Sequence, residues 1–194
     1  MSTLQAQAII GDPGWANADN ESQLVERAKC DRDAFAELYR RHCEMLLRHV
    51  YRRTGDVHVT EDVVADVFLT ALKTLPCYRC QGVPVRFWLL RIATNAVNRW
   101  ARRQRRHAAA LLRLEHLEAV AASPRSPDEA WNEQHAERAL LSLPPKYQAV
   151  LSLHYFEQLA IKDVAAVIGC RVGTVKSRLA RGRDLLREKL NGRR

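Results

Sequence analysis

The sequence contains no stretch of about 20 consecutive apolar residues, the length that a helix needs to cross a bilayer. Its first residues also lack the basic start and the continuous apolar run of a secretory signal. Both absences argue against a membrane-inserted or exported protein. We therefore expect a cytoplasmic protein that does not insert into a membrane.

Motifs for catalysis or metal binding are equally scarce. No Ser/His/Asp set, phosphate-binding loop or metal motif is recognisable, so we expect neither enzymatic activity nor a cofactor. The five cysteines are odd in number and scattered, which argues against a disulfide scaffold. Cys77 and Cys80 form a CxxC pair, but structural zinc takes four ligands. A redox role for this pair stays open, and we predict no metal site.

Positive charge is what the sequence has in excess, and it is unevenly placed. Lys and Arg number 31 against 22 Asp and Glu, a formal net charge of +9. Residues 99–106 hold five arginines, and residues 171–194 hold nine basic residues against two acidic ones. Residues 115–137, between these blocks, hold six acidic residues and one arginine. An excess of this size indicates a polyanionic partner, either nucleic acid or an anionic membrane surface.

Apolar residues recur at three- and four-residue spacing along most of the chain, and no alternating strand pattern is longer than a few residues. A length of 194 residues allows two small domains. We therefore predict an all-α fold of two small helical domains joined by a flexible linker. The expected helices cover about residues 24–53, 60–75, 85–106, 128–143 and 145–157, followed by a helix-turn-helix over residues 161–189.

The helix expected from Val85 has two chemically different faces. One is apolar and should pack inward; it holds Leu89, Ile92, Ala93, Ala96, Val97 and Trp100. The opposite face holds Asn95, Arg99, Arg102 and Arg106 at spacings of four, three and four residues. This helix should therefore present cations on one side and pack with the other.

Residues 161–189 contain the strongest local signal. Residues 161–168 predict a short amphipathic helix, and Gly169 tolerates the positive φ of a tight turn. Ala165 is small enough for two helices to cross, and Val175 would fill the core between them. In a helix-turn-helix the start of the second helix enters the major groove. The candidate DNA contacts are Arg171, Thr174, Lys176, Ser177, Arg178 and Arg181. The alternative is a helical hairpin with a solvated cationic face.

The order of several motifs resembles that of bacterial sigma factors of the extracytoplasmic-function (ECF) type. Residues 34–39, 61–69 and 86–95 are similar to the second sigma domain, and residues 143–147, 151–157 and 173–181 to the fourth. The resemblance covers about residues 24–190. The glycines, proline and asparagines of residues 1–22 predict a disordered tail. The resemblance implies sigma domain 2 over 23–108, a linker over 109–127 and sigma domain 4 over 128–194. The chain departs from the pattern at Val85, Ala65 and Arg99.

The resemblance also implies roles for individual residues. Contacts with core RNA polymerase would come from Asp62, Val63, Asp66, Phe68 and Leu69. The promoter's −10 element would be held by Tyr78, Arg79, Gln81, Asn95, Arg99, Arg102 and Arg103, with Trp88 as a packing residue. The −35 element would be bound as duplex by the second helix of the helix-turn-helix. The acidic segment would pass through the polymerase cleft or serve as an ordinary solvated linker.

The partners expected from this resemblance are core RNA polymerase, promoter DNA and an anti-sigma factor. The alternative is a helix-turn-helix regulator that works as a dimer without polymerase. Such a regulator needs a dimerisation helix and a sensor domain, and residues 24–106 resemble neither.

Overall fold

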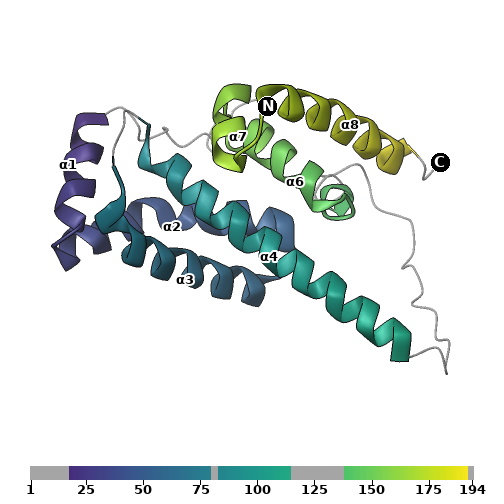
Figure 1. Ribbon diagram of the computed structural model, residues 1–194, viewed down its shortest axis with the longest axis horizontal. Coiled ribbons are helices and arrows are strands. Elements are labelled where there is room, and N and C mark those ends of the chain that lie inside the picture. Colours follow the sequence, from purple (N-terminus) through teal and green to yellow (C-terminus); the bar gives the residue numbers. More distant parts are fainter. Residues whose placement is uncertain (1–17, 80–82, 115–137, 192–194) are drawn as a thin grey trace, which may run out of the picture.

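The computed structural model describes residues 18–79, 83–114 and 138–191, with side chains over 20–79, 83–107 and 138–191. Within these ranges every regular element is helical (Figure 1), which confirms the predicted all-α class. The N-terminal unit consists of α1 (Ala18–Ala28), α2 (Arg32–Thr54), α3 (Val57–Thr74), the short 3₁₀ turn η1 (Leu75–Cys77) and α4 (Val85–Leu114). The C-terminal unit consists of α6 (Pro145–Leu151), the wide π turn η2 (Ser152–Phe156), α7 (Ile161–Ile168) and α8 (Val172–Asn191). No helix in the described ranges is both long and apolar enough to span a membrane.

The turn between α2 and α3 is built from capping residues. Gly55 ends α2 with a φ of 68°, a left-handed conformation that glycine adopts without a steric penalty. Asp56 then begins α3, because its side chain accepts a hydrogen bond from the backbone N–H of Val59 at 2.9 Å. The predicted break at residues 54–56 is thereby confirmed.

Two clusters of buried apolar residues stabilise the molecule. The larger one runs from α2, α3 and α4 into α6, η2, α7 and α8 without interruption. The smaller one joins α1 and α2 to residues on either side of the segment between η1 and α4; it consists of Leu24, Val25, Ala28, Ala34, Leu38, Leu75 and Val85. The smaller cluster therefore holds both ends of the segment that leads into α4.

The structure gives some helix limits that the sequence left open or placed elsewhere. Helix α1 begins at Ala18, inside the stretch expected as a tail, and is separated from α2 by a turn at residues 29–31. Helix α4 continues to Leu114, past the domain end expected at residue 108. The helix expected over 145–157 changes to a π turn at Ser152. The first difference matters most, because α1 contributes buried residues to the smaller cluster.

The two units pack against each other rather than standing apart. The most extensive contact between them is that of α4 with α7, and α2 also contacts η2 and α6. Figure 1 shows α6, α7 and α8 lying along one side of α4. We call this packing of the two units the closed arrangement.

Candidate nucleic-acid and polymerase-binding surfaces

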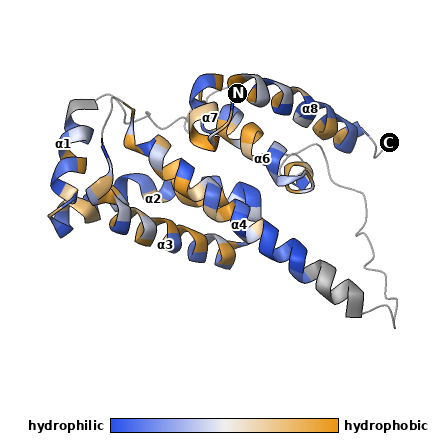
Figure 2. Cartoon of the chain, in the orientation of Figure 1, coloured by the Kyte–Doolittle hydropathy of each residue, from blue (hydrophilic) through white to orange (hydrophobic). Residues whose placement is uncertain are grey.

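The two predicted faces of α4 are present. Leu89 and Ala93 are fully buried, and Val97 is 1% exposed. Asn95, Arg99, Arg102 and Arg103, the predicted DNA contacts, are all exposed. Figure 2 shows the matching change in hydropathy, from a mixed first half of α4 to a hydrophilic stretch beyond it. Among the described residues, no carboxylate forms an ion pair with these three arginines, so their charge faces solvent.

Tyr78, which follows η1, packs against an aromatic residue of α4. The ring of Tyr78 lies 4.6 Å from that of Trp88, centroid to centroid, and the Tyr78 hydroxyl donates a hydrogen bond to the Val83 carbonyl at 3.3 Å. Trp88 is half-buried and contacts both apolar clusters, so it packs as expected. Arg79 is exposed, whereas Gln81 and Cys80 lie outside the described residues. One face of the Tyr78 ring is therefore already used for packing.

Helix α7, its turn and α8 form the predicted helix-turn-helix. Gly169 has a φ of 74°, Ala165 is 5% exposed at the crossing and Val175 is fully buried. Four of the predicted DNA contacts, Arg171, Lys176, Ser177 and Arg181, are exposed, while Thr174 and Arg178 are half-buried. The motif is thus formed with a basic start of its second helix.

A glycine lets α8 approach α6 closely. A β-carbon on Gly182 would lie 3.2 Å from the Cδ1 atom of Leu151, which is tighter than an ordinary contact. The sequence shows a glycine in the middle of a helix, where it costs about 1 kcal/mol relative to alanine. The close crossing of the two helices accounts for it.

Helix α3 and α2 enclose an apolar groove with acidic residues near it. The groove has a volume of about 500 Å³, and Leu69 and Leu72 on its wall are 54% and 49% exposed. Asp62 and Asp66, predicted to bind polymerase, are exposed on the same helix. Exposed leucines of this kind beside carboxylates that form no ion pair within the described residues are compatible with the predicted protein-binding surface.

Two of the five predicted polymerase contacts are buried in the described structure. Val63 is 8% exposed and lies in the larger cluster, and Phe68 is 5% exposed at the base of the groove with its ring 4.4 Å from that of Tyr39. Their place on the inward stripe of α3 buries them. Phe68 still lines the groove, whereas Val63 is not among its lining residues, and the polymerase contacts of all five residues stay predictions.

Comparisons with known proteins identify the family of both units. The family described as "Sigma-70 region 2" matches residues 38–107, which hold most of α2 together with α3 and the basic part of α4. The family described as "Sigma-70, region 4" matches residues 134–186, which hold the helix-turn-helix. The ECF RNA polymerase sigma factor SigM of Mycobacterium tuberculosis is 32% identical over 177 residues, covering 91% of this chain and 87% of the relative. This chain belongs to the ECF RNA polymerase sigma factors.

Two further comparisons are consistent with that assignment. SigE of Mycolicibacterium smegmatis, another ECF sigma factor, is 32% identical over 162 residues, which are 79% of this chain but 60% of SigE. The solved structure of the sigma factor RpoE with the anti-sigma factor NepR from Bartonella quintana shares the fold, with a TM-score of 0.64 and 24% identity over 82% of this chain and 98% of the solved chain. The predicted family is thereby confirmed, and sigma factors are transcription initiation factors.

The sequence did not point to a basic cluster that this sigma factor buries between its two units. We use this term for His49, Arg52 and Arg53 of α2, of which His49 and Arg52 contact Glu157 of the C-terminal unit. Burial lowers the pKa of Arg53 to about 10, and Arg53 Nη2 donates a hydrogen bond to Asn98 Oδ1 at 2.7 Å. Burial also lowers the pKa of His49, although Glu157 lies 3.4 Å away. The sequence contains one indication of this cluster: His49 and Arg53 lie four residues apart on the apolar stripe of α2.

A second contact missed from the sequence connects α1 to the start of α4. Glu21 Oε1 lies 3.3 Å from His42 Nε2 of α2. The neighbouring His42 ring and, to a smaller extent, the Val85 backbone N–H hold the pKa of Glu21 below its ordinary value. Glu21 lies within the stretch expected as a tail, so its role could not be assigned beforehand.

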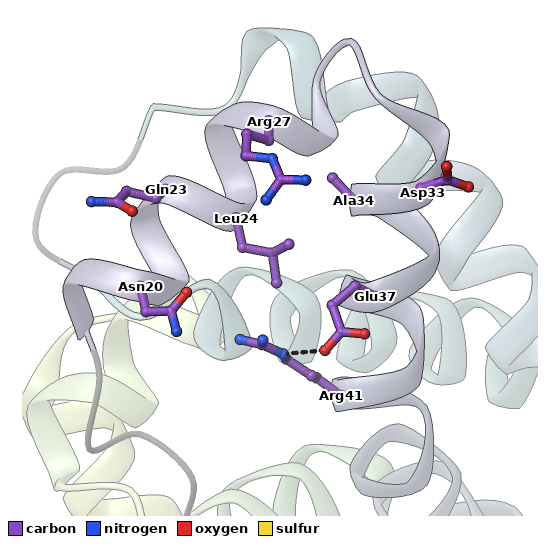
Figure 3. A pocket seen from close by; sticks show the side chains of 8 residues that line it. All are labelled: Asn20, Gln23, Leu24, Arg27, Asp33, Ala34, Glu37 and Arg41. Atoms are coloured by element: carbon purple, nitrogen blue, oxygen red, sulfur yellow. Dashed lines mark hydrogen bonds and ion pairs between the residues drawn. The ribbon is translucent and has the colours of Figure 1, made fainter.

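The small pocket between α1 and α2 does not add a site. Figure 3 shows its lining, in which Glu37 is bound by Arg41 at 2.8 Å. Its volume is about 200 Å³, and Arg27 is directed to Asp31 at 3.5 Å. Three of its four charged side chains, Arg27, Glu37 and Arg41, are thus already paired. In the described part of the chain no cluster of three or more His, Cys, Asp or Glu side chains could hold a metal ion.

Proposed function

We propose that this sigma factor binds core RNA polymerase and directs it to promoters by contacting two separate DNA elements. The observation that supports this most strongly is the pair of exposed basic helix faces, on α4 and α8, within the stretches that match sigma regions 2 and 4. One chain with two separate DNA-binding surfaces can contact both elements of a promoter, so no dimer is required. The alternative, a dimeric regulator, needs a sensor domain. Residues 38–107 match sigma region 2 instead of such a domain.

The −10 element would be bound and melted by the N-terminal unit. Asn95, Arg99, Arg102 and Arg103 form a cationic strip along which a single-stranded backbone can lie. Tyr78 and Arg79 follow η1 and precede α4 in the chain, where they could hold a base outside the stack. Gln81, between them and α4, completes the proposed set.

The −35 element would be bound as duplex by α8. Its N-terminal residues combine hydroxyl groups with cations, which can donate to base edges and to phosphates. Ser177 already donates to the Thr174 carbonyl at 3.0 Å, so its hydroxyl oxygen remains available only as an acceptor. Specificity would therefore depend mainly on Arg171, Lys176, Arg178 and Arg181.

Polymerase would bind the groove between α2 and α3. Asp62 and Asp66 lie four residues apart on an exposed face, which suits pairing with arginines of a partner helix. The solved relative RpoE is bound to an anti-sigma factor, and we propose that an anti-sigma factor also controls this chain. The protein would work in the cytoplasm with polymerase and have no enzymatic activity of its own.

Assembly with core polymerase tests this assignment. Asp62→Lys/Asp66→Lys should prevent co-elution of the chain with core polymerase in gel filtration, since it places cations where the proposed partner presents its own. A matched control is Asp184→Lys/Glu188→Lys, which makes the same charge change at the same spacing on α8. Normal assembly of the α3 variant would remove these aspartates from the interface.

A further inference from the structure

Helix α1 lies outside the stretch that matches sigma region 2, because that stretch begins at residue 38. The helix is nevertheless packed into the N-terminal unit. Its most extensive contact is with α2, and it also contacts α4. Leu24, Val25 and Ala28 are no more than 5% exposed. Helix α1 is therefore an integral part of this unit, although the matched family stretch does not include it.

The buried residues of α1 share a cluster with both ends of the segment between η1 and α4. Leu75 of η1 is fully buried, and Val85, the first residue of α4, is 1% exposed. Tyr78 and Trp88 pack against the same cluster. Tyr78 and its neighbour Arg79 are the described residues of this segment that we propose as contacts for the −10 element. The ends of the segment that carries them are thus held against α1.

Glu21 joins α1 to α2 and to the first turn of α4. Its Oε1 atom lies 3.3 Å from His42 Nε2, and the side chains of Glu21 and His42 are 22% and 11% exposed. The His42 ring lowers the pKa of Glu21 most, and the Val85 backbone N–H and the Arg86 guanidinium lower it further. A backbone N–H has this effect only when it lies beside the carboxylate, so Glu21 faces the start of α4.

The residue before α4 cannot cap this helix with its side chain. Pro84 immediately precedes α4 and has no side-chain hydrogen-bond acceptor. The first N–H groups of a helix lack intrahelical partners, and a nearby carboxylate stabilises them. Asp31 and Asp56 do this for α2 and α3 from the adjacent position in the chain. For α4 the carboxylate comes from another helix, through Glu21.

We infer that Glu21 is a positioning residue for recognition of the −10 element. It holds the first turn of α4, and with it Tyr78 and Arg79, in the arrangement that receives a base outside the stack. The cationic strip along α4 begins at Asn95, about three helical turns further on, so its contacts with the DNA backbone do not depend on Glu21. This inference rests on the proposed function of the N-terminal unit and adds to it a helix outside the matched stretch.

Sequence discrimination tests this role, because a loss of positioning and a loss of stability change it differently. Holoenzyme is assembled from core polymerase and the full-length chain. Fluorescence anisotropy then measures its affinity for two labelled single strands: the −10 strand of a promoter selected in run-off reactions, and a scrambled strand of the same composition. Glu21→Ala should weaken binding of the −10 strand by about fivefold, the size expected for loss of a helix cap, and leave binding of the scrambled strand unchanged.

Matched variants separate the role of Glu21 from that of α1 in general. Glu26→Ala is the control, since Glu26 is 59% exposed and pairs with Lys29 at 2.7 Å; it should change neither affinity. Glu21→Ala/Pro84→Asp places a carboxylate directly before α4 and should restore the affinity for the −10 strand. Glu21→Gln keeps the size of the side chain and should show the same selective loss if Glu21→Ala fails to fold.

Three results would overturn the inference. The first is an equal proportional loss for both strands, which would assign Glu21 a role in stability alone. The second is unchanged discrimination in both Glu21→Ala and Glu21→Gln. The third is a double variant as weak as Glu21→Ala, which would show that Glu21 does not act through the first turn of α4.

Failure of the proposed function gives a different result. In that case the natural holoenzyme itself would bind the −10 strand no better than the scrambled strand. Amide hydrogen exchange of residues 83–88 then still decides whether Glu21 holds the start of α4. Exchange should be faster in Glu21→Ala than in Glu26→Ala, and equal exchange in the two variants would refute the contact.

Discussion

The buried imidazole of His49 should make the stability of this sigma factor depend on pH near neutrality. His49 is fully buried, and its Nε2 atom lies 3.4 Å from the Thr94 hydroxyl. Removal from water disfavours the charged imidazolium and lowers the pKa of His49 below its ordinary 6.5, and this outweighs the opposing effect of Glu157. The folded chain therefore takes up a proton at His49 only at a lower pH than the unfolded chain.

The sign and size of the effect follow from this difference. Above the ordinary pKa of 6.5, His49 is neutral in both states, and its burial carries no protonation penalty. As the pH falls below that value, the unfolded chain binds a proton that the folded chain does not. The free energy of unfolding should then decrease by about 1.4 kcal/mol per pH unit until the folded pKa is reached. Glu21, with its lowered pKa, loses its stabilising effect only in a more acidic range.

Urea unfolding followed by circular dichroism measures this dependence. The natural chain and His49→Gln, which cannot titrate, should be compared between about pH 7.5 and about pH 5.5, the range in which histidine changes charge. The natural chain should lose more stability on acidification than the variant does. Parallel pH profiles of the two chains would refute the claim that His49 is held neutral by burial.

Three other results are expected. Replacing Arg178 and Arg181 with alanine should weaken −35 duplex binding by about 1–3 kcal/mol for each lost base contact, as measured by fluorescence anisotropy. The control Arg183→Ala/Arg187→Ala should weaken binding less. Equal losses in the two variants would contradict the assignment of base contacts to the N-terminal half of α8. Leu89→Ala, at a fully buried position, should lower the free energy of unfolding by about 2–5 kcal/mol, and a chain of unchanged stability in urea would contradict the α4 packing. Duplex binding should weaken with salt with a logarithmic slope of about −0.9 per phosphate contacted, so a flat salt response would argue against both basic surfaces.

The sequence predicted what depends on local pattern. The periodicity of α4 separated the buried Ala93 and Val97 from the exposed Arg99 and Arg102, because an amphipathic helix has one inward side. Gly169 and Ala165 identified the helix-turn-helix for a similar reason, since a tight turn and a close crossing each restrict the residue type.

What the sequence could not predict depends on contacts between distant residues. Arg52 and Glu157 are 105 positions apart, and no local rule pairs them. Val63 and Phe68 were assigned to a binding surface from their place in a motif, but their burial is set by how α3 packs on α2 and α4. Helix α1 was partly assigned to a tail because its buried side chains belong to a cluster that only tertiary structure completes.

Transcription by core RNA polymerase supplied with this chain tests the central claim most directly. Run-off reactions on a library of promoter sequences should yield transcripts that core polymerase alone does not make, and their templates should share two separated sequence elements upstream of the start. If the chain binds duplex DNA but adds no transcript to those of core polymerase, the assignment of its two basic helices to promoter recognition is contradicted.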